Sequence, residues 1–207
     1  MSHVRNTDCP GYFPGPATWP WCRWLPGQLL VALASVLVSL LNLYSQQAKP
    51  TEYQVKAAYL YNFGRFVEWP ASFAATGDSF SICVLGQDPF GATLDAVLTG
   101  EAIDGKSVVA RRILRPQEAV HCRILFISSS ENSQLKEILV ALDHSGVLTV
   151  SDIPQFSQYG GMIQFVLQGN RIRFEVNLAA AQDAGLTLSS ELLKVAVSVR
   201  RNSRTGD

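Results

Sequence analysis

The residues most able to do redox, metal or nucleophilic chemistry are few and far apart in the sequence. The four cysteines are Cys9, Cys22, Cys83 and Cys122, and the three histidines are His3, His121 and His144. No two cysteines form a C-x-x-C pair and the histidines lack ligand spacing, so we expect no metal site. His121 beside Cys122 could activate a thiol, but adjacent side chains on a strand point to opposite faces. Hydrolase and metallopeptidase motifs are missing too, so we expect no catalytic residue, no cofactor and no enzyme.

Cys83 and Cys122 each lie near the start of a short apolar segment. Segments 80–85 and 122–127 are rich in Ile, Val and Phe and are bounded by polar or turn residues, which is typical of buried strands. If these strands are neighbours in a parallel sheet, the cysteines lie at the same height and within bonding distance, provided that their side chains face each other. A disulfide is the favoured interpretation, and two free buried thiols are the alternative. The bridge would close a loop of about 40 residues and contribute about 4 kcal/mol.

The loop after the first of these strands is a candidate anion site. Its sequence is GQDPFG, and Asp88 followed by Pro89 predicts a helix from about Pro89 to Leu98. The N–H groups at a helix start attract anions, although this loop matches neither the dinucleotide-binding nor the Walker motif. We therefore predict a set of ligand-binding residues at the carboxyl ends of the first and third strands: Gly86, Asp88, Phe90, Gly91 and Ser128.

An aromatic helix at 51–70 is a candidate contact surface for a partner protein. Thr51 is a suitable N-cap, Pro70 stops the helix after Trp69, and apolar residues recur at helical spacing between them. The candidate contact residues are Tyr59, Phe63, Phe66 and Trp69, because tyrosine and tryptophan are frequent at binding hot spots. A helix that only covers the core is the alternative.

The last predicted strand adds a second candidate contact region, which consists of Arg173, Glu175 and Asn177. These polar residues alternate with Phe174 and Val176. We expect them to anchor a partner or to order the hairpin that contains them, whereas an exposed edge strand is the alternative.

The elements that must position these residues alternate between strands and helices. Strands are predicted at 80–85, 107–114, 122–127 and 147–151, with a turn at 116–119 and a helix that Ser130 caps and residues 144–146 end. A Gly-Asn turn joins strands 162–167 and 172–176, and helices follow at 177–184 and 189–199. The pattern predicts an α/β fold: a doubly wound, mostly parallel sheet with strand order 2-1-3, helices on both faces and a C-terminal antiparallel hairpin at one edge.

The first 50 residues differ in composition from the rest. Residues 29–41 are apolar and uncharged, and Arg23 precedes them, as expected of a signal peptide. An uncleaved anchor and a buried helix are the alternatives. We expect a signal peptide or leader at 1–50, one α/β domain at 51–200 and a flexible tail at 201–207. The chain of 207 residues has seventeen basic and seventeen acidic side chains. This balance argues against a nucleic-acid-binding protein.

Six stretches spread over the domain form a family pattern: YQVKAAYLYNFGRFVEWP, ICVLGQDPFG, CRILFIS, VLTVSD, GGMIQFVLQGNRIRFEVN and AGLTLSSELLKVA. The combination resembles the YfiR family of bacterial periplasmic regulators, and the match covers about residues 53–200. The resemblance implies export to the periplasm, an α/β fold and a disulfide between Cys83 and Cys122.

The resemblance also implies a function. YfiR-like proteins are not enzymes; they bind the periplasmic part of an inner-membrane diguanylate cyclase or sensor protein and hold it inactive, which lowers cyclic di-GMP and biofilm formation. An outer-membrane lipoprotein or redox stress relieves this inhibition, and a homodimer with a second disulfide is known in the family. The matching stretch here, HSGVLTVSD, has no cysteine. The alternative function is a periplasmic small-molecule-binding protein with a pocket at the carboxyl ends of the central strands.

Overall fold

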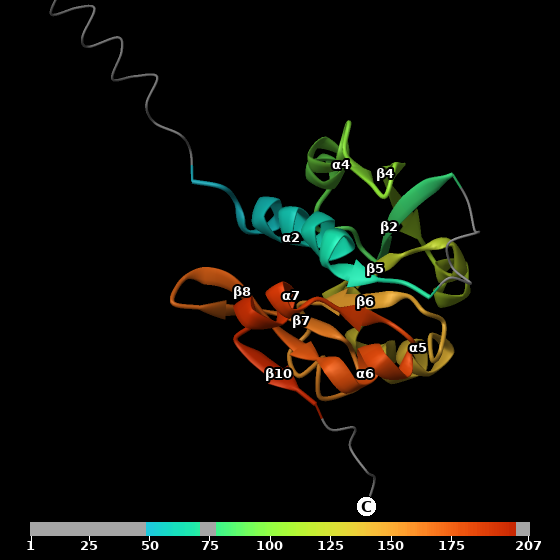
Figure 1. Ribbon diagram of the computed structural model, residues 1–207, viewed down its shortest axis with the longest axis vertical. Coiled ribbons are helices and arrows are strands. Elements are labelled where there is room, and N and C mark those ends of the chain that lie inside the picture. Colours follow the sequence, from blue (N-terminus) through green and yellow to red (C-terminus); the bar gives the residue numbers. More distant parts are fainter. Residues whose placement is uncertain (1–48, 71–77, 202–207) are drawn as a thin grey trace, which may run out of the picture. The chain divides into compact units, whose positions relative to one another are not determined.

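The computed structural model describes residues 49–70 and 78–201 (Figure 1). Residues from Pro50 onwards form one compact unit. The predicted leader, with Cys9 and Cys22, lies outside the described residues, as does most of the predicted tail. None of the helices described is long and apolar enough to span a bilayer.

One large sheet organises the described part of the chain. Its strand order is β10-β8-β7-β6-β5-β2-β4-β3. The pairs are parallel except for β7 with β8 and β3 with β4, which are antiparallel. The strands are β2 (Ser79–Leu85), β3 (Ala102–Ile103), β4 (Lys106–Ile113), β5 (Ile124–Ile127), β6 (Leu148–Ser151), β7 (Ile163–Gln168), β8 (Arg171–Asn177) and β10 (Ser198–Arg200). The predicted mostly parallel sheet, with the order 2-1-3 for β4, β2 and β5, is confirmed.

Alternate residues of the central strands pack into two separate cores. Ile82 of β2 and Phe126 of β5 lie in a core with α2 (Glu52–Phe66) and α4 (Ala92–Leu98). Cys83 of β2 lies in the other core, with the short helix η1 (Pro116–His121) and α5 (Leu135–Ala141). Side chains on a strand alternate between faces, so these two cores cover opposite faces of the sheet. The prediction of helices on both faces is therefore confirmed.

The long helix α2 begins as predicted but ends earlier. The Thr51 hydroxyl accepts a hydrogen bond from the Gln54 N–H, and the Gln54 side chain accepts one from the Thr51 N–H, which forms a capping box. The helix ends at Phe66 rather than at Trp69. The next two residues form β1 (Val67–Glu68), which pairs with β9 (Thr187–Leu188) in a small second sheet. Tertiary pairing thus overrides the helical pattern at this end.

The chain's last segment differs from the prediction in a way that matters for the candidate residues. Instead of one helix at 189–199, α7 (Ser190–Val195) is followed by β10, which pairs in parallel with β8. The hairpin β7–β8 therefore lies near the edge of the sheet, but β8 is not the edge strand. The edge-strand interpretation is wrong for Glu175 and Asn177, because β10 pairs with residues 175–177 on their outer side. The remaining elements are η2 (Ser129–Gln134) and α6 (Leu178–Asp183).

Candidate functional site

The disulfide between Cys83 and Cys122 is present, with the two Cα atoms 5.9 Å apart and both side chains buried. The expectation that the two cysteines lie at the same height in neighbouring strands is wrong, because Cys83 lies opposite Leu125 in the register of β2 and β5. Cys122 precedes β5 and follows η1, where its N–H donates to the Ala119 carbonyl. The bridge thus ties η1 to the central strand, beneath one face of the sheet, rather than tying two strands together.

The predicted ligand loop lies at the carboxyl end of β2, but its acceptors bind Arg112 from β4. The Arg112 Nε donates to Asp88 at 2.8 Å, and Nη2 donates to the Gly91 carbonyl at 2.8 Å. The same guanidinium forms a bidentate pair with Asp95 of α4, at 2.6 and 2.8 Å. The hydrogen bonds to Asp95 raise the pKa of Arg112, and in return they lower the pKa of Asp95. This arrangement holds the loop, β4 and α4 together.

The other predicted ligand-binding residues are close to this loop and serve its folding. Phe90 is buried in the core, 4.8 Å from the ring centroid of Phe126, and is not free to contact a ligand. The buried Ser128 hydroxyl accepts a hydrogen bond from the Ser130 N–H, and the Ser130 hydroxyl accepts one from the Gln87 N–H. Helix α4 begins at Ala92 rather than near Pro89, because Asp88 caps a turn by accepting from the Phe90 N–H.

Gly86 has a conformation that this close packing requires. Its φ is +86°, which is in the region that favours glycine, and a Cβ there would collide with the side chains of Ser130 and Glu131. The loops after β2 and β5 are thus brought together as predicted. Ligand binding by these residues stays a prediction.

The four aromatic residues of the α2 region lie in different environments. Phe63 has no exposed surface and stacks against Phe165, which corrects the expectation that it lies on a contact surface. Trp69 is half-buried and meets Phe80 edge to face at a centroid distance of 5.3 Å. Phe66 is 38% exposed. Tyr59 is half-buried, and its hydroxyl donates to the Ile172 carbonyl of β8 at 3.5 Å.

The polar residues of β8 lie on the face opposite to Tyr59. Because Phe174 and Val176 face α2, the intervening side chains point to the other side of the sheet. Asn177 is buried and caps α6, accepting from the Ala180 N–H while its amide donates to the Ser157 carbonyl. The Ser157 hydroxyl also donates to Glu175 at 3.4 Å. The guanidinium of Arg173 donates to the Val195 carbonyl.

Asn177 and Glu175 thus order the end of the hairpin, one of the two roles expected of them. The two groups of predicted partner-binding residues do not form one continuous surface. Tyr59 and the β8 set are separated by the sheet itself.

A buried ion pair that the sequence did not predict joins Lys56 of α2 to Asp152, which follows β6. The Lys56 Nζ lies 2.6 Å from Asp152 and 2.5 Å from Glu52, and the lysine side chain is only 3% exposed. The Tyr53 hydroxyl also donates to Asp152, at 3.5 Å, and the Nζ lies 4.5 Å from the centre of the Tyr53 ring. The other Asp152 carboxylate oxygen, Oδ1, is buried and has no hydrogen-bond partner among the described residues.

Burial shapes the electrostatics of this cluster. Burial by itself lowers the pKa of Lys56, but the hydrogen bonds to Asp152 and Glu52 and the charge of Asp152 outweigh it, so the net pKa is raised. Burial also raises the pKa of Tyr53. Both groups therefore keep their protons at neutral pH. The only sign of this cluster in the sequence was a lysine four residues after Glu52, on the inward side of the helix, a spacing that allows an ion pair within one helix.

The hairpin carries the most exposed apolar side chain of this region. Leu167 of β7 is 67% exposed and pairs across the hairpin with Ile172. Leu167 lies on the same face as Phe165, which packs against α2. The tip of the hairpin projects from the body of the domain (Figure 1). We call Tyr59, Leu167 and Ile172 the hairpin surface. Tyr59 and Ile172 pack against the core that α2 covers, and Leu167 pairs with Ile172.

Comparison with known proteins identifies the family. A family model described as YfiR/HmsC-like matches residues 53–197. Among solved structures, a conserved domain protein from Vibrio cholerae O1 biovar El Tor is 12% identical, with a TM-score of 0.49 over 74% of this chain and 62% of that one. An ABC domain in complex with L-Trp from Streptococcus pneumonia is also 12% identical, with a TM-score of 0.44 over 58% of this chain and 55% of that one.

The chain thus spans about 62% and 55% of the lengths of these two structures. The family match is far more extensive, because it covers nearly the whole described domain with its sheet, disulfide and hairpin. It confirms the resemblance that the sequence stretches indicated. The chain belongs to the YfiR/HmsC-like family.

Proposed function

We propose that this protein is an exported, non-enzymatic regulator that binds the periplasmic part of an inner-membrane signalling protein, a diguanylate cyclase, and holds it inactive. Binding would lower cyclic di-GMP and biofilm formation. The observation that carries this proposal is the family match over residues 53–197. Regulation by direct contact, without catalysis, is what members of this family do.

The disulfide supports a periplasmic location. Disulfides persist in oxidising compartments and are rare in the cytosol. The Cys83–Cys122 bridge lies in the buried core between β2 and η1, where it is protected from solvent. An exported chain would form this bridge in the periplasm, after the leader has directed it there.

The hairpin surface supports binding to another protein. An exposed leucine beside a half-buried tyrosine suits the centre of a protein interface, where apolar and aromatic side chains are enriched. Leu167 has no described structural role that would explain its exposure. We therefore place the contact with the signalling protein at Tyr59, Leu167 and Ile172, rather than on the polar face of β8.

A gene deletion tests the proposal. We expect deletion to raise cellular cyclic di-GMP, and the wild-type gene to restore the low level. Leu167→Asp should fail to restore it and should lose the membrane partner in a pull-down, because a carboxylate disrupts an apolar contact. Val140→Asp is the matched control, since Val140 is 76% exposed but lies on α5. Unchanged cyclic di-GMP on deletion, with no membrane partner captured, would refute the regulator function.

The small-molecule alternative has less support. The loop that would bind the ligand uses its acceptors for Arg112, and Phe90 is buried in the core. Native mass spectrometry of the protein purified from the periplasm would detect a retained ligand and favour this alternative.

A further inference from the structure

The outer edge of β4 is open over most of its length. The short strand β3 pairs only with Lys106 and Ser107, and one more bond follows from the Val108 N–H to the Glu101 carbonyl. Within residues 49–70 and 78–201, no strand pairs with the outer side of β4 after that point. Because backbone groups alternate along a strand, the outward N–H groups after Val108 belong to Ala110 and Arg112. An open edge of this kind can accept an added strand.

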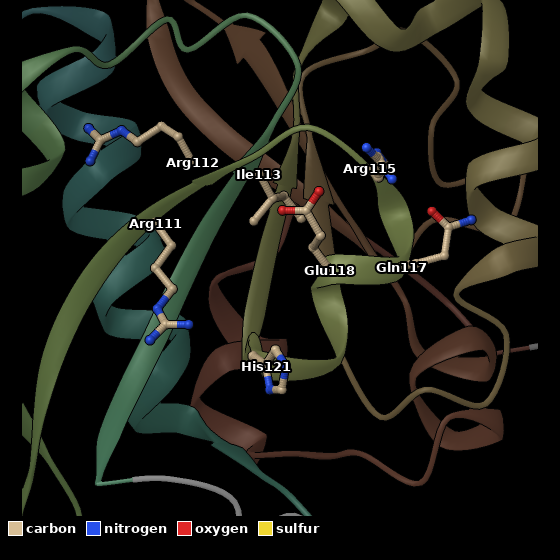
Figure 2. A pocket seen from close by; sticks show the side chains of 7 residues that line it. All are labelled: Arg111, Arg112, Ile113, Arg115, Gln117, Glu118 and His121. Carbon is tan, nitrogen blue, oxygen red and sulfur yellow. The ribbon is translucent and has the colours of Figure 1, made fainter.

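Two hollows adjoin β4, one at its first half and one at its second half. The first has a volume of about 570 Å³ and is lined by Val108, Val109 and Ala110 of β4, together with residues of α4, of β3 and of the turns beside them, including the acidic Asp95 and Glu101. The second has a volume of about 670 Å³ and is lined by residues 111–113 of β4 and by the segment that follows (Figure 2). Together their linings include β4 from Ser107 to Ile113.

The second hollow is basic. Arg111, Arg115 and His121 line it and are exposed, and Glu118 is the one acidic residue among its lining side chains. Figure 2 shows Arg111 and Arg112 extending from β4 in different directions. Arg112 is neutralised by Asp88 and Asp95, whereas the structure gives Arg111 and Arg115 no ion pair with any described carboxylate. Two arginines without an ion pair and one glutamate leave a net positive charge for an occupant of this hollow.

We propose that the open edge of β4 is a docking site for an extended, acidic segment of a partner protein, which adds to the sheet as a strand. The segment's backbone would bond the outward groups of Ala110 and Arg112, and its acidic side chains would meet Arg111 and Arg115. A second copy of this chain fits less well, because pairing two β4 edges would bring like charges together. The site is separate from the hairpin surface, and it does not require that the partner be a diguanylate cyclase.

A synthetic peptide tests this docking site directly. The probe is an eight-residue peptide of alternating Glu and Val, with blocked ends and a fluorescent label, titrated with protein purified from cells that express the full chain. We expect binding that weakens with salt, and slower hydrogen exchange at the Ala110 and Arg112 amides when the peptide is bound. The peptide with Lys in place of Glu should not bind.

Protein variants separate the backbone contribution from the charge contribution. Arg111→Glu with Arg115→Glu should weaken binding about tenfold or more, because two attractive pairs become repulsive. Ala110→Pro should weaken peptide binding about fivefold, because proline lacks the outward N–H that the peptide would bond. Proline is tolerated on the open side of an edge strand, so the sheet itself should stay intact. Lys136→Glu on α5 is the matched charge-reversal control and should bind as the wild type does.

Three results of the peptide experiment would overturn the proposal. They are the absence of peptide binding by the wild type, equal binding of the lysine peptide, and binding without protection of the two amides. The amide readout uses the wild-type protein, so it holds even where a variant folds poorly. A wild-type dimer that Ala110→Pro dissociates would identify a second copy as the occupant and would also overturn it. None of these results bears on cyclic di-GMP, so this proposal and the regulator function can fail independently.

Discussion

Replacing Asp152 with alanine should destabilise the protein more than replacing its partner. The substitution leaves the Lys56 ammonium in the core, where the side chain is 3% exposed. Glu52 still lies 2.5 Å away, but its side chain is about half exposed and offers a weaker compensating charge. A buried lysine must then either keep a poorly solvated charge or lose its proton.

The magnitude follows from general values for buried ion pairs. Removing one partner of such a pair costs about 3–5 kcal/mol. We expect the lower end, about 3 kcal/mol, because Glu52 remains. For a domain of this size, each kcal/mol lowers the melting temperature by about 2–4 °C, so the expected decrease is about 6–12 °C.

A double-mutant cycle measured by thermal and urea unfolding tests this reasoning. Lys56→Met should cost less, about 1–2 kcal/mol, because the Asp152 side chain is 17% exposed and keeps the Tyr53 hydroxyl as a donor. Combining Lys56→Met with Asp152→Ala removes both charges. We expect the double variant to be more stable than Asp152→Ala alone, since no unpaired charge stays buried.

Glu52→Gln is the control and should change stability by less than about 1 kcal/mol, because the Glu52 side chain is about half exposed and the glutamine still accepts a hydrogen bond from Lys56. The reasoning is refuted if Asp152→Ala costs less than about 1 kcal/mol, or if adding Lys56→Met destabilises it further.

Three further predictions concern the rest of the fold. Replacing Cys83 and Cys122 by alanine should lower the free energy of unfolding by about 4 kcal/mol, because the unfolded chain regains the entropy that closing a loop of about 40 residues removes. Equal melting temperatures of the wild type and the variant in oxidising buffer would argue against this stabilisation by the disulfide. Gly161→Ala should lower the free energy of unfolding by about 1–3 kcal/mol, because the added Cβ collides with the buried ring of Phe156. In the double variant, Phe156→Leu should recover part of this loss of stability. Strictly additive losses for the two substitutions would speak against the collision. The pKa of Lys56 is raised in the folded state, so protonated Lys56 stabilises the fold fully below the ordinary pKa of 10.5, and this stabilisation is lost as pH rises through the higher folded pKa. The melting temperature measured from pH 9 to 11.5 should therefore fall more steeply for the wild type than for Lys56→Met. Parallel curves of melting temperature against pH would contradict this.

The docking edge and the hairpin surface lie in different parts of the sheet. The hairpin β7–β8 and the open strand β4 are separated by β6, β5 and β2 in the strand order. Variants at Leu167 and Arg111 therefore lie too far apart in the sheet to share contacts, and their effects should be independent. A partner that used both surfaces would have to reach across the whole sheet.

The sequence by itself determined the class of fold and the family. Apolar runs of strand length with helices between them are local patterns, and they predicted a mostly parallel sheet with β4, β2 and β5 in the correct order. The capping box at Thr51 and the hairpin turn were also readable, because each depends on residues close together in the chain. The family stretches needed no structure either, and the family match confirmed them.

Only the tertiary structure decided what the candidate residues do. Phe63 and Phe90 look like surface aromatics in the sequence, but the sheet buries them. Cys122 looks like a strand residue, but η1 carries it to Cys83 three positions out of register.

The contacts that matter most join residues far apart in the chain. Lys56 and Asp152 are separated by 96 positions, and no local pattern links them. The open edge of β4 depends on how short β3 is and on where it pairs. Which side chains are exposed, which are buried and which pair with each other is decided only when distant segments of the chain have packed against each other.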